Sequence, residues 1–203
     1  MTPLVSIIVC VYNEPELIVR ALDSVPRRDD IEVVIVDDGS TDNTLEVVAD
    51  YADAHKEICI RIIHCDENRG LGHAKNVAYD NCRGEYISQL DSDDYLYTKK
   101  YESVMKQLDG TDIVCFDLVV NSGEVFRLNP QSQRGYCAGA ARFIRREFLG
   151  DSRCPEIRAA EDWALNEELL QKPHTIKFSG TPAYHYNFPR EGSLYDRLVK
   201  GQL

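Results

Sequence analysis

The sequence predicts a single α/β domain, a Rossmann-like open mixed sheet flanked by helices, and three observations carry that prediction. Short, β-branched apolar runs recur through the first half of the chain. Stretches with helical spacing of apolar residues separate these runs. Polar clusters follow the runs, as expected where an open sheet binds ligands at the carboxyl ends of its strands.

Strand and helix alternate as βαβαβαβ over the first half of the chain. Nearly continuous apolar runs predict strands that are buried on both faces of a parallel sheet. These strands are expected over residues 5–11, 32–37, 59–64 and 85–90. Helical spacing predicts the helices between them, over residues 15–25, 41–55 and 71–82.

The pattern changes after Asp94, and the second half mixes both kinds of element. Helices are expected over residues 98–108, 140–148 and 160–170. Strands are expected over residues 112–120, 124–128, 175–178 and 184–188. The first two of these strands are expected to form a hairpin across Asn121-Ser122-Gly123. We treat the change as a boundary between subregions of one domain.

Composition excludes several classes of protein. The net charge is −11 and no dense basic run is present, so nucleic-acid binding is not expected. The apolar runs are far shorter than the roughly 20 residues of a membrane-spanning helix. The N-terminus has no secretory signal pattern, so we expect a cytoplasmic location. The seven cysteines form no Cys-x-x-Cys pair, which favours reduced thiols over disulfides or a zinc site.

An acidic cluster, Asp91-Ser92-Asp93-Asp94, follows the fourth predicted strand. Carboxylates this close repel one another and need a compensating charge. Their oxygen atoms suit a hard divalent cation such as Mg²⁺ or Mn²⁺. A calcium-binding loop starting at Asp91 is excluded, because Leu96 stands where glycine is required and Tyr95 where an oxygen ligand is needed.

Three further polar clusters follow predicted strands: Val11-Tyr12-Asn13-Glu14, Asp37-Asp38-Gly39-Ser40-Thr41-Asp42, and Asn68-Arg69-Gly70 with Lys75 beyond it. The second is also a plausible strand-to-helix turn, with Gly39 available for positive φ and Ser40 or Thr41 as helix cap. A turn needs only one acid, so Asp38 is a candidate acceptor for the N–H and hydroxyl groups of a nucleoside. Neither a dinucleotide fingerprint nor a P-loop is present.

Together the four clusters resemble the family 2 glycosyltransferases of the GT-A fold over residues 4–97. The likeness extends more weakly through Glu161-Asp162-Trp163 and Tyr184-His185-Tyr186 to about Ser193. It implies an inverting enzyme that moves a sugar from a nucleotide-diphosphate donor, with a UDP-sugar favoured, to a glycan or lipid-linked glycan acceptor. Surface polysaccharide biosynthesis is the expected setting. Residues 1–97 would bind the nucleotide sugar and residues 98–203 the acceptor.

The resemblance also implies roles for the residues of the strand-end clusters. Tyr12 and Asp38 would hold the donor's base, while Glu14 and Lys75 would lie near the base, ribose or phosphate. Neighbouring residues of the same motifs would complete the nucleotide-sugar site, namely Val11, Asn13, Asp91 and Ser92.

Asp91 with Asp93 would form the metal-binding DXD motif for Mn²⁺ or Mg²⁺, and Asp94 is a rival ligand. Spacing does not separate the carboxylate that binds the metal from the one that binds ribose. Asp162 resembles the family's general base, which takes the acceptor hydroxyl's proton. The alternative is that Glu161 and Asp162 only occupy a first helical turn, where the helix dipole favours acids.

Several points stay open in the second half. His185 and Arg190 could reach the metal or the diphosphate, although a strand histidine is more often structural. A lone helical tryptophan such as Trp163 is more often part of the core than a sugar-stacking group. The stretch Gly135–Arg146 contains no tryptophan, so it does not indicate the acceptor.

Two other functions are alternatives to transfer. A nucleotide-sugar-binding subunit without turnover is the main alternative, and a nucleotidyltransferase is disfavoured because Val11–Pro15 replaces its basic, glycine-rich loop. No long extension follows Arg190, so a processive synthase is not expected, and peripheral membrane association and oligomeric state are open.

Overall fold

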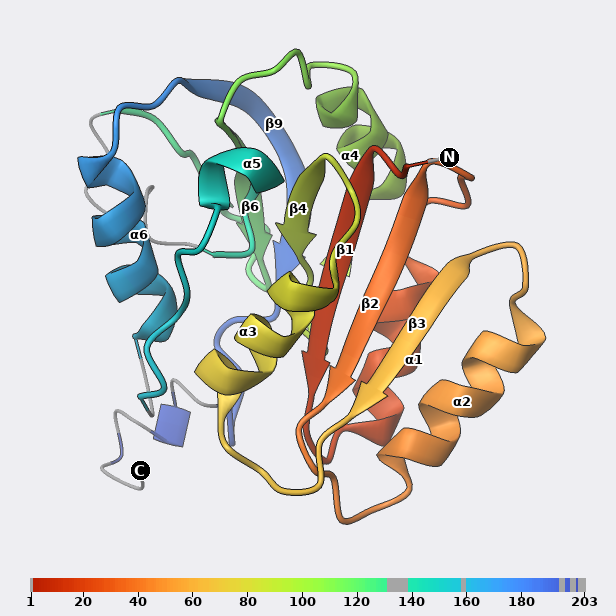
Figure 1. Cartoon of the computed structure of the whole chain (residues 1–203). Helices are drawn as coiled ribbons and strands as arrows, with labels where there is room; N and C mark the ends of the chain where they lie inside the picture. Colours follow the sequence, from red (N-terminus) through yellow and green to blue (C-terminus); the bar gives the residue numbers. More distant parts are fainter. Residues whose placement is uncertain (1, 131–138, 158–159, 194–195, 198–199, 201–203) are drawn as a thin grey trace.

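One mixed sheet forms the centre of the computed structural model, which describes residues 2–130, 139–157, 160–193, 196–197 and 200 (Figure 1). Its strands are β1 (Val5–Val11), β2 (Ile31–Asp37), β3 (Cys59–His64), β4 (Tyr86–Gln89), β5 (Tyr95–Leu96), β6 (Ile113–Val120), β7 (Val125–Phe126), β8 (Arg142–Arg145) and β9 (Ile176–Tyr186). They lie in the order β3-β2-β1-β4-β8-β6-β9-β5, and β7 pairs with β6. The predicted open mixed sheet of a single α/β domain is confirmed.

Helices cover both faces of this sheet. They are α1 (Pro15–Asp23), α2 (Thr44–Ala54), α3 (Leu71–Asn81), α4 (Thr98–Met105), α5 (Arg146–Leu149) and α6 (Glu161–Gln171). One core cluster joins the sheet to α1, α2 and α4 through side chains such as Ile18, Val48 and Tyr101. The other joins the opposite face to α3 and α6 through Ala78 and Leu165. The two faces alternate along β1, as the period of a strand requires.

The first half follows the prediction closely. β1 pairs in parallel with β2 and β4, and β2 pairs in parallel with β3. The expectation that all these strands are buried on both faces is wrong for β3, in which no residue is fully buried. β3 is an edge strand, so it has a neighbour on one side only.

The predicted helix over residues 140–148 is wrong. Arg142–Arg145 instead forms β8, which lies antiparallel between β4 and β6, with Ile144 opposite both Ile87 and Ile113. Only Arg146–Leu149 is helical. Backbone hydrogen bonds to two neighbouring strands override the helical spacing of the side chains, and both neighbours are distant in sequence.

The last part of the sheet also differs from expectation. The two short strands predicted near residues 175–178 and 184–188 are one strand, β9, which continues through Gly180 at a φ of 63°. The predicted hairpin is confirmed, since β6 and β7 pair across Asn121–Gly123. β9 also pairs with the short β5, which was not predicted, and this brings Tyr184 opposite Leu96.

No helix among the described residues combines the length and the apolar character needed to cross a membrane.

Candidate functional site

The polar clusters gather at one edge of the sheet. β1, β2 and β4 run parallel, so the loops that follow them leave the same edge, as the arrowheads of β1 and β2 indicate (Figure 1). The backbone N–H of Asp38 donates to the carbonyl of Val11 at 2.9 Å, and Leu90 donates to Ile8 at 2.9 Å. These bonds hold the loop starts side by side and place the acidic segment next to β1.

Asn13 fastens the first loop to the second. Its side-chain oxygen accepts from the N–H of Thr41 at 2.8 Å, and its amide donates to the Thr41 hydroxyl at 3.2 Å. The Asn13 backbone has a φ of 53°, and its N–H donates to the Ser40 hydroxyl at 3.0 Å. Val11 is buried, while Tyr12 is 42% exposed. Asn13 therefore organises the loop, and Tyr12 presents an aromatic ring beside it.

Asp37 and Asp38 have different hydrogen-bond partners and different structural roles. Asp37 is fully buried and makes the turn, accepting from the Ser40 N–H and hydroxyl, while its other oxygen lies 2.8 Å from Nδ1 of His64. The carboxylate of Asp38 accepts from the N–H groups of Arg69 at 3.2 Å and Gly70 at 2.8 Å. Burial raises the pKa of Asp38. Asp38 thus links the end of β2 to the start of α3.

Gly39 is required where these loops cross. Its φ is 72°, in the left-handed region that favours glycine. A Cβ there would lie 2.6 Å from the backbone carbon of Glu67. Any other residue would push the second and third loops apart.

Asp94 faces away from the loops and into the sheet. It is fully buried, and its two oxygens accept from the Tyr184 hydroxyl at 2.6 Å and the Asn187 N–H at 2.7 Å. Burial, with the nearby charges of Asp91 and Asp93, raises the pKa of Asp94 to about 8. Asp94 ties the acidic segment to β9.

Asp91 and Asp93 keep more accessible carboxylates. The amide of Gln89 donates to Asp91 at 2.5 Å. Burial raises the pKa of Asp91 to about 6, although the charge of Lys75 acts in the opposite direction. One oxygen of Asp93 lies 2.6 Å from Nε of Arg190, and burial raises the pKa of Asp93.

Arg190 reaches the acidic segment from the end of the chain. Besides Asp93 it contacts Glu14, whose other oxygen accepts from the Ser92 hydroxyl, and the Arg190–Glu14 distance is 2.8 Å. Glu14, Ser92 and Asp93 are therefore neighbours, as expected for one site. The guanidinium group of Arg190 is the cation that Glu14 and Asp93 share.

Lys75 is a buried cation between α3 and α6. Its Nζ donates to Glu161 at 2.6 Å, and the two side chains are 2% and 4% exposed. Burial alone lowers the pKa of Lys75, but the charges of Glu161, Asp91 and Asp162 outweigh it and raise the pKa. The lysine thus contacts the residue before Asp162, which positions the start of α6.

Asp162 lies at the same site, partly exposed. Its oxygens accept from the N–H groups of Gly139 at 3.3 Å and Trp163 at 2.9 Å. A Cβ on Gly139 would lie 3.1 Å from the Gln89 amide oxygen and 3.4 Å from an Asp162 oxygen. Gly139 therefore lies between Asp162 and Gln89, the residue that donates to Asp91. Trp163 was expected to be part of the core, as a lone helical tryptophan usually is, but this expectation is wrong because its exposed fraction is 47%.

Sequence reasoning missed the tyrosines of β9. Tyr184 donates to Asp94 and accepts from the N–H of Asp91 at 3.0 Å. Burial raises the pKa of Tyr186, and so do the charges of four nearby acids, Asp91, Asp93, Asp94 and Asp162. Tyr184 and Tyr186 are two residues apart, which puts them on one face of a strand, and this spacing could have indicated that both face the site. His185 lies between the two tyrosines in sequence and faces away from them. Its ring stacks on Tyr95, with the ring centroids 4.2 Å apart.

Residues 135–138 of the predicted acceptor-side stretch lie outside the described residues.

The chain is similar to proteins of one family. The model of that family, described as glycosyl transferase family 2, matches residues 6–161. Chondroitin synthase of Escherichia coli is 46% identical over 96 residues, which is 46% of this chain and 14% of that protein.

Two solved structures have a similar fold. The Staphylococcus aureus TarS 1–349 complex with UDP-GlcNAc has a TM-score of 0.81 at 26% identity, covering 93% of this chain and 59% of that one. Mannosyltransferase PcManGT from Pyrobaculum calidifontis, in complex with GDP-Man and Mn2+, has a TM-score of 0.77 at 23% identity, covering 100% and 62%. This chain spans less than two thirds of each of these relatives.

Proposed function

The chain belongs to glycosyltransferase family 2, and on that premise we propose that it transfers a sugar, with inversion, from a nucleotide-diphosphate donor to a glycan or lipid-linked glycan. The convergence of the DXD segment, Asp162 and the exposed Tyr12 at one sheet edge carries this proposal. The donor proposed is a UDP-sugar, supported by the TarS complex with UDP-GlcNAc. A role in surface polysaccharide synthesis is supported by the similarity to chondroitin synthase.

The donor half of the site is assigned to residues 1–97. Tyr12 would stack on the base through its exposed ring, and Asp38 would accept from the base through lone pairs that its two backbone donors leave free. Glu14 and Ser92 would face the ribose or phosphates from the next loop. Val11, Asn13 and Lys75 would act indirectly, by holding the loops and α6 that carry these groups.

Asp91 and Asp93 fit a hard divalent cation. Their carboxylates are oxygen ligands of the kind that Mg²⁺ and Mn²⁺ prefer. Burial raises the pKa values of both groups, and the charges of neighbouring acids act in the same direction. When bound, the cation would supply charge neutralisation for the departing diphosphate. Asp94 is assigned a positioning role, because it is fully buried and its carboxylate holds Tyr184 of β9 and the Asn187 N–H that follows it.

Asp162 is assigned as the general base of transfer. The acceptor oxygen forms a bond to the anomeric carbon while the bond to the nucleoside diphosphate breaks, and the acceptor's proton passes to an Asp162 oxygen. Each oxygen accepts one backbone N–H, which fixes the carboxylate and leaves lone pairs for the proton. Residues 98–203 would thus carry the base and the acceptor surface. The cytoplasmic location and a peripheral contact with membranes stay predictions.

Donor screening followed by turnover tests this proposal. Nucleotide sugars are screened by thermal shift with Mn²⁺, and release of the nucleoside diphosphate is then measured with the best donor and a glycan acceptor panel. Asp162→Asn should bind the donor like the wild type and lose about 10²- to 10⁴-fold in turnover. The control Asp50→Asn changes an exposed acid of α2 and should behave as wild type. Donor binding without any Asp162-dependent turnover would favour a nucleotide-sugar-binding subunit instead.

A further inference from the structure

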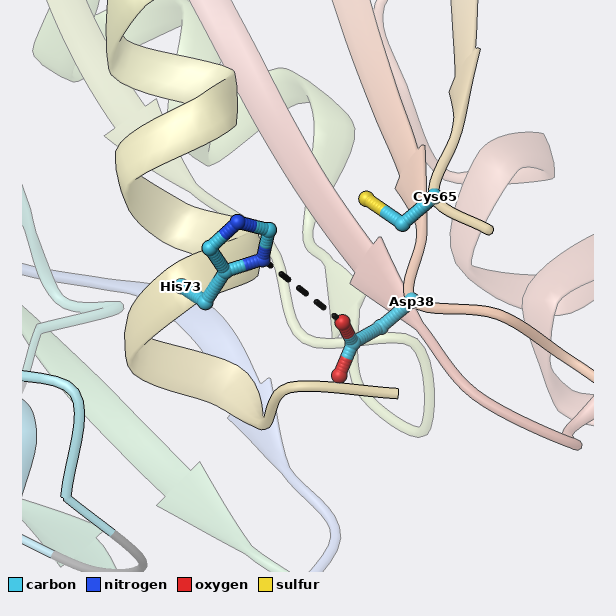
Figure 2. Close-up of side chains that lie close together, drawn as sticks. All are labelled: Asp38, Cys65 and His73. Atoms are coloured by element: carbon cyan, nitrogen blue, oxygen red, sulfur yellow. Dashed lines mark ion pairs between the residues drawn. The ribbon is translucent and has the colours of Figure 1, made fainter. Parts of the chain in front are cut away.

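A second set of ligand-type side chains lies beside the donor site. Asp38 follows β2, Cys65 follows β3, and His73 is in the first part of α3. One potential ligand atom from each side chain lies within 4.8 Å of the other two. Figure 2 shows the Cys65 sulfur, the His73 ring and the Asp38 carboxylate directed toward a common space.

The ligand atoms of Asp38, Cys65 and His73 differ in chemistry from those of Asp91 and Asp93 in the DXD motif. Thiolate, imidazole and carboxylate together form the ligand set of Zn²⁺, whereas Mg²⁺ and Mn²⁺ favour oxygen atoms alone. Zinc bonds of about 2.0–2.3 Å put the ligand atoms of one tetrahedral ion about 3.3–3.8 Å apart. Nδ1 of His73 lies 3.9 Å from the nearer oxygen of Asp38, close to this spacing. The Cys65 sulfur lies within 4.8 Å of both, so a bound ion would have to draw it closer by no more than about 1.5 Å.

One ring nitrogen of His73 lacks a hydrogen-bond partner. This atom, Nδ1, is buried and has no partner among the described residues. The separation of 3.9 Å from Asp38 is too long for a hydrogen bond. A buried polar atom without a partner is uncommon in folded proteins, and a bound ion is one explanation for it.

Surrounding bonds hold two of the three ligands in place. The Arg69 and Gly70 N–H groups orient the Asp38 carboxylate, in the way that outer hydrogen bonds orient metal ligands. The Cys65 N–H donates to the Asp37 carbonyl at 2.9 Å, which fixes the backbone that carries the thiol. The group is therefore preorganised by the same loops that build the donor site.

We propose that Asp38, Cys65 and His73 bind one Zn²⁺ ion, with water completing its coordination and the Cys65 thiol proton released to solvent. Reduced thiols that bind no metal were expected, because the sequence contains no Cys-x-x-Cys pair. These ligands instead come from three separate segments that the fold brings together. Since the proposed function assigns Asp38 to the donor's base, zinc and nucleotide should exclude one another, and this consequence rests on that function.

Direct metal titration tests the site. Calorimetry with Zn²⁺ alone should give one site per chain in the wild type, and Co²⁺ in its place should give a thiolate charge-transfer band. Affinity should fall at least tenfold in Cys65→Ser and in His73→Ala, and the Co²⁺ band should vanish in Cys65→Ser. Cys59→Ser is the matched control, because Cys59 begins β3 while Cys65 follows the other end of that strand. Unchanged zinc affinity in Cys65→Ser or His73→Ala, with both variants folded by circular dichroism, would overturn the site.

A competition experiment separates the zinc site from the proposed function. UDP binding is measured with Mg²⁺ present, with and without Zn²⁺. Zinc should weaken UDP binding in the wild type and have no effect in Cys65→Ser. Simultaneous binding of both ligands would overturn the exclusion. Absence of UDP binding in the zinc-free wild type would count against the proposed function, while the titration alone decides the zinc site.

Discussion

Neighbouring carboxylates in this chain have different partners, and those partners set their roles. Asp37 and Asp94 are fully buried and accept from groups that shape the turn and hold β9. Asp38 instead accepts from the N–H groups at the start of α3, and Asp93 is partly exposed beside Arg190. Sequence alone identified the acidic pairs but did not assign a role to each member, because the direction of a side chain depends on loops that are remote in the chain.

At Tyr12, the exposed ring is expected to contribute to nucleotide binding. Tyr12→Ala should weaken UDP binding about fivefold or more, since stacking a base on an aromatic ring contributes about 1 kcal/mol or more. Tyr12→Phe keeps the ring and should bind as wild type. Calorimetry with UDP and Mn²⁺ measures both. Equal affinity in the alanine variant would remove Tyr12 from the site.

Asp94 should make stability depend on pH in the metal-free protein. Its folded pKa of about 8 lies above the ordinary value of 3.8, so the folded state binds more protons than the unfolded state between these values. The free energy of unfolding should therefore fall as pH rises from about 5 to about 8. The raised pKa of Asp91 acts in the same direction over the lower part of that range.

Asp94→Asn is the variant that isolates this effect. The asparagine oxygen can still accept from the Asn187 N–H, while its amide can donate to the Tyr184 hydroxyl. Urea unfolding in EDTA at several pH values should show a shallower decline for the variant than for the wild type. If the free energy of unfolding fell equally steeply with pH in the variant and the wild type, the pKa of Asp94 would not be raised in the folded protein.

At the scale of the element, the start of α6 is held against α3 by a buried ion pair. Glu161→Gln should lower the free energy of unfolding by about 3 kcal/mol, because it leaves the Lys75 charge buried without its closest partner. Replacing both residues, Lys75→Met with Glu161→Leu, should recover much of that loss.

Urea unfolding of these variants measures the effect, and an exposed ion pair provides the control. Lys56 and Asp53 on the surface also lie 2.6 Å apart, with 73% and 83% exposed side chains. Asp53→Asn should change stability little, since solvent screens such pairs. A similarly small effect of Glu161→Gln would mean that the Lys75–Glu161 pair does not hold α6.

Local pattern predicted the elements of the first half well, and the reason is that βαβ units are built from neighbours in sequence. It failed at β8, where the strand conformation of Arg142–Arg145 depends on β4 and β6 on either side. It also divided β9 at Gly180, although pairing with β6 carries the strand through that residue. Both errors fall in elements whose strand partners are distant in sequence.

For the whole molecule, the first half supplies most residues of the proposed donor site, and the second half adds Asp162, Tyr184 and Arg190 beside them. The strand-end clusters were predictable because parallel strands bring their carboxyl ends to one edge. The contacts of Tyr184 and Tyr186 with this site were not, because β9 lies about ninety residues further along the chain. Arg190 was a candidate for the site, but its ion pairs with Glu14 and Asp93 were not foreseen. The net charge of −11 adds to the need for a cation when the ligand is itself an anion.

Calorimetric titration of UDP, with and without Mn²⁺, tests the central claim of a cation-assisted nucleotide-sugar site most directly. The wild type should bind UDP at least tenfold more tightly with Mn²⁺, and Asp93→Asn should lose that gain while staying folded. Wild-type protein that binds no UDP under either condition, or an Asp93→Asn variant with the full gain from Mn²⁺, would contradict it.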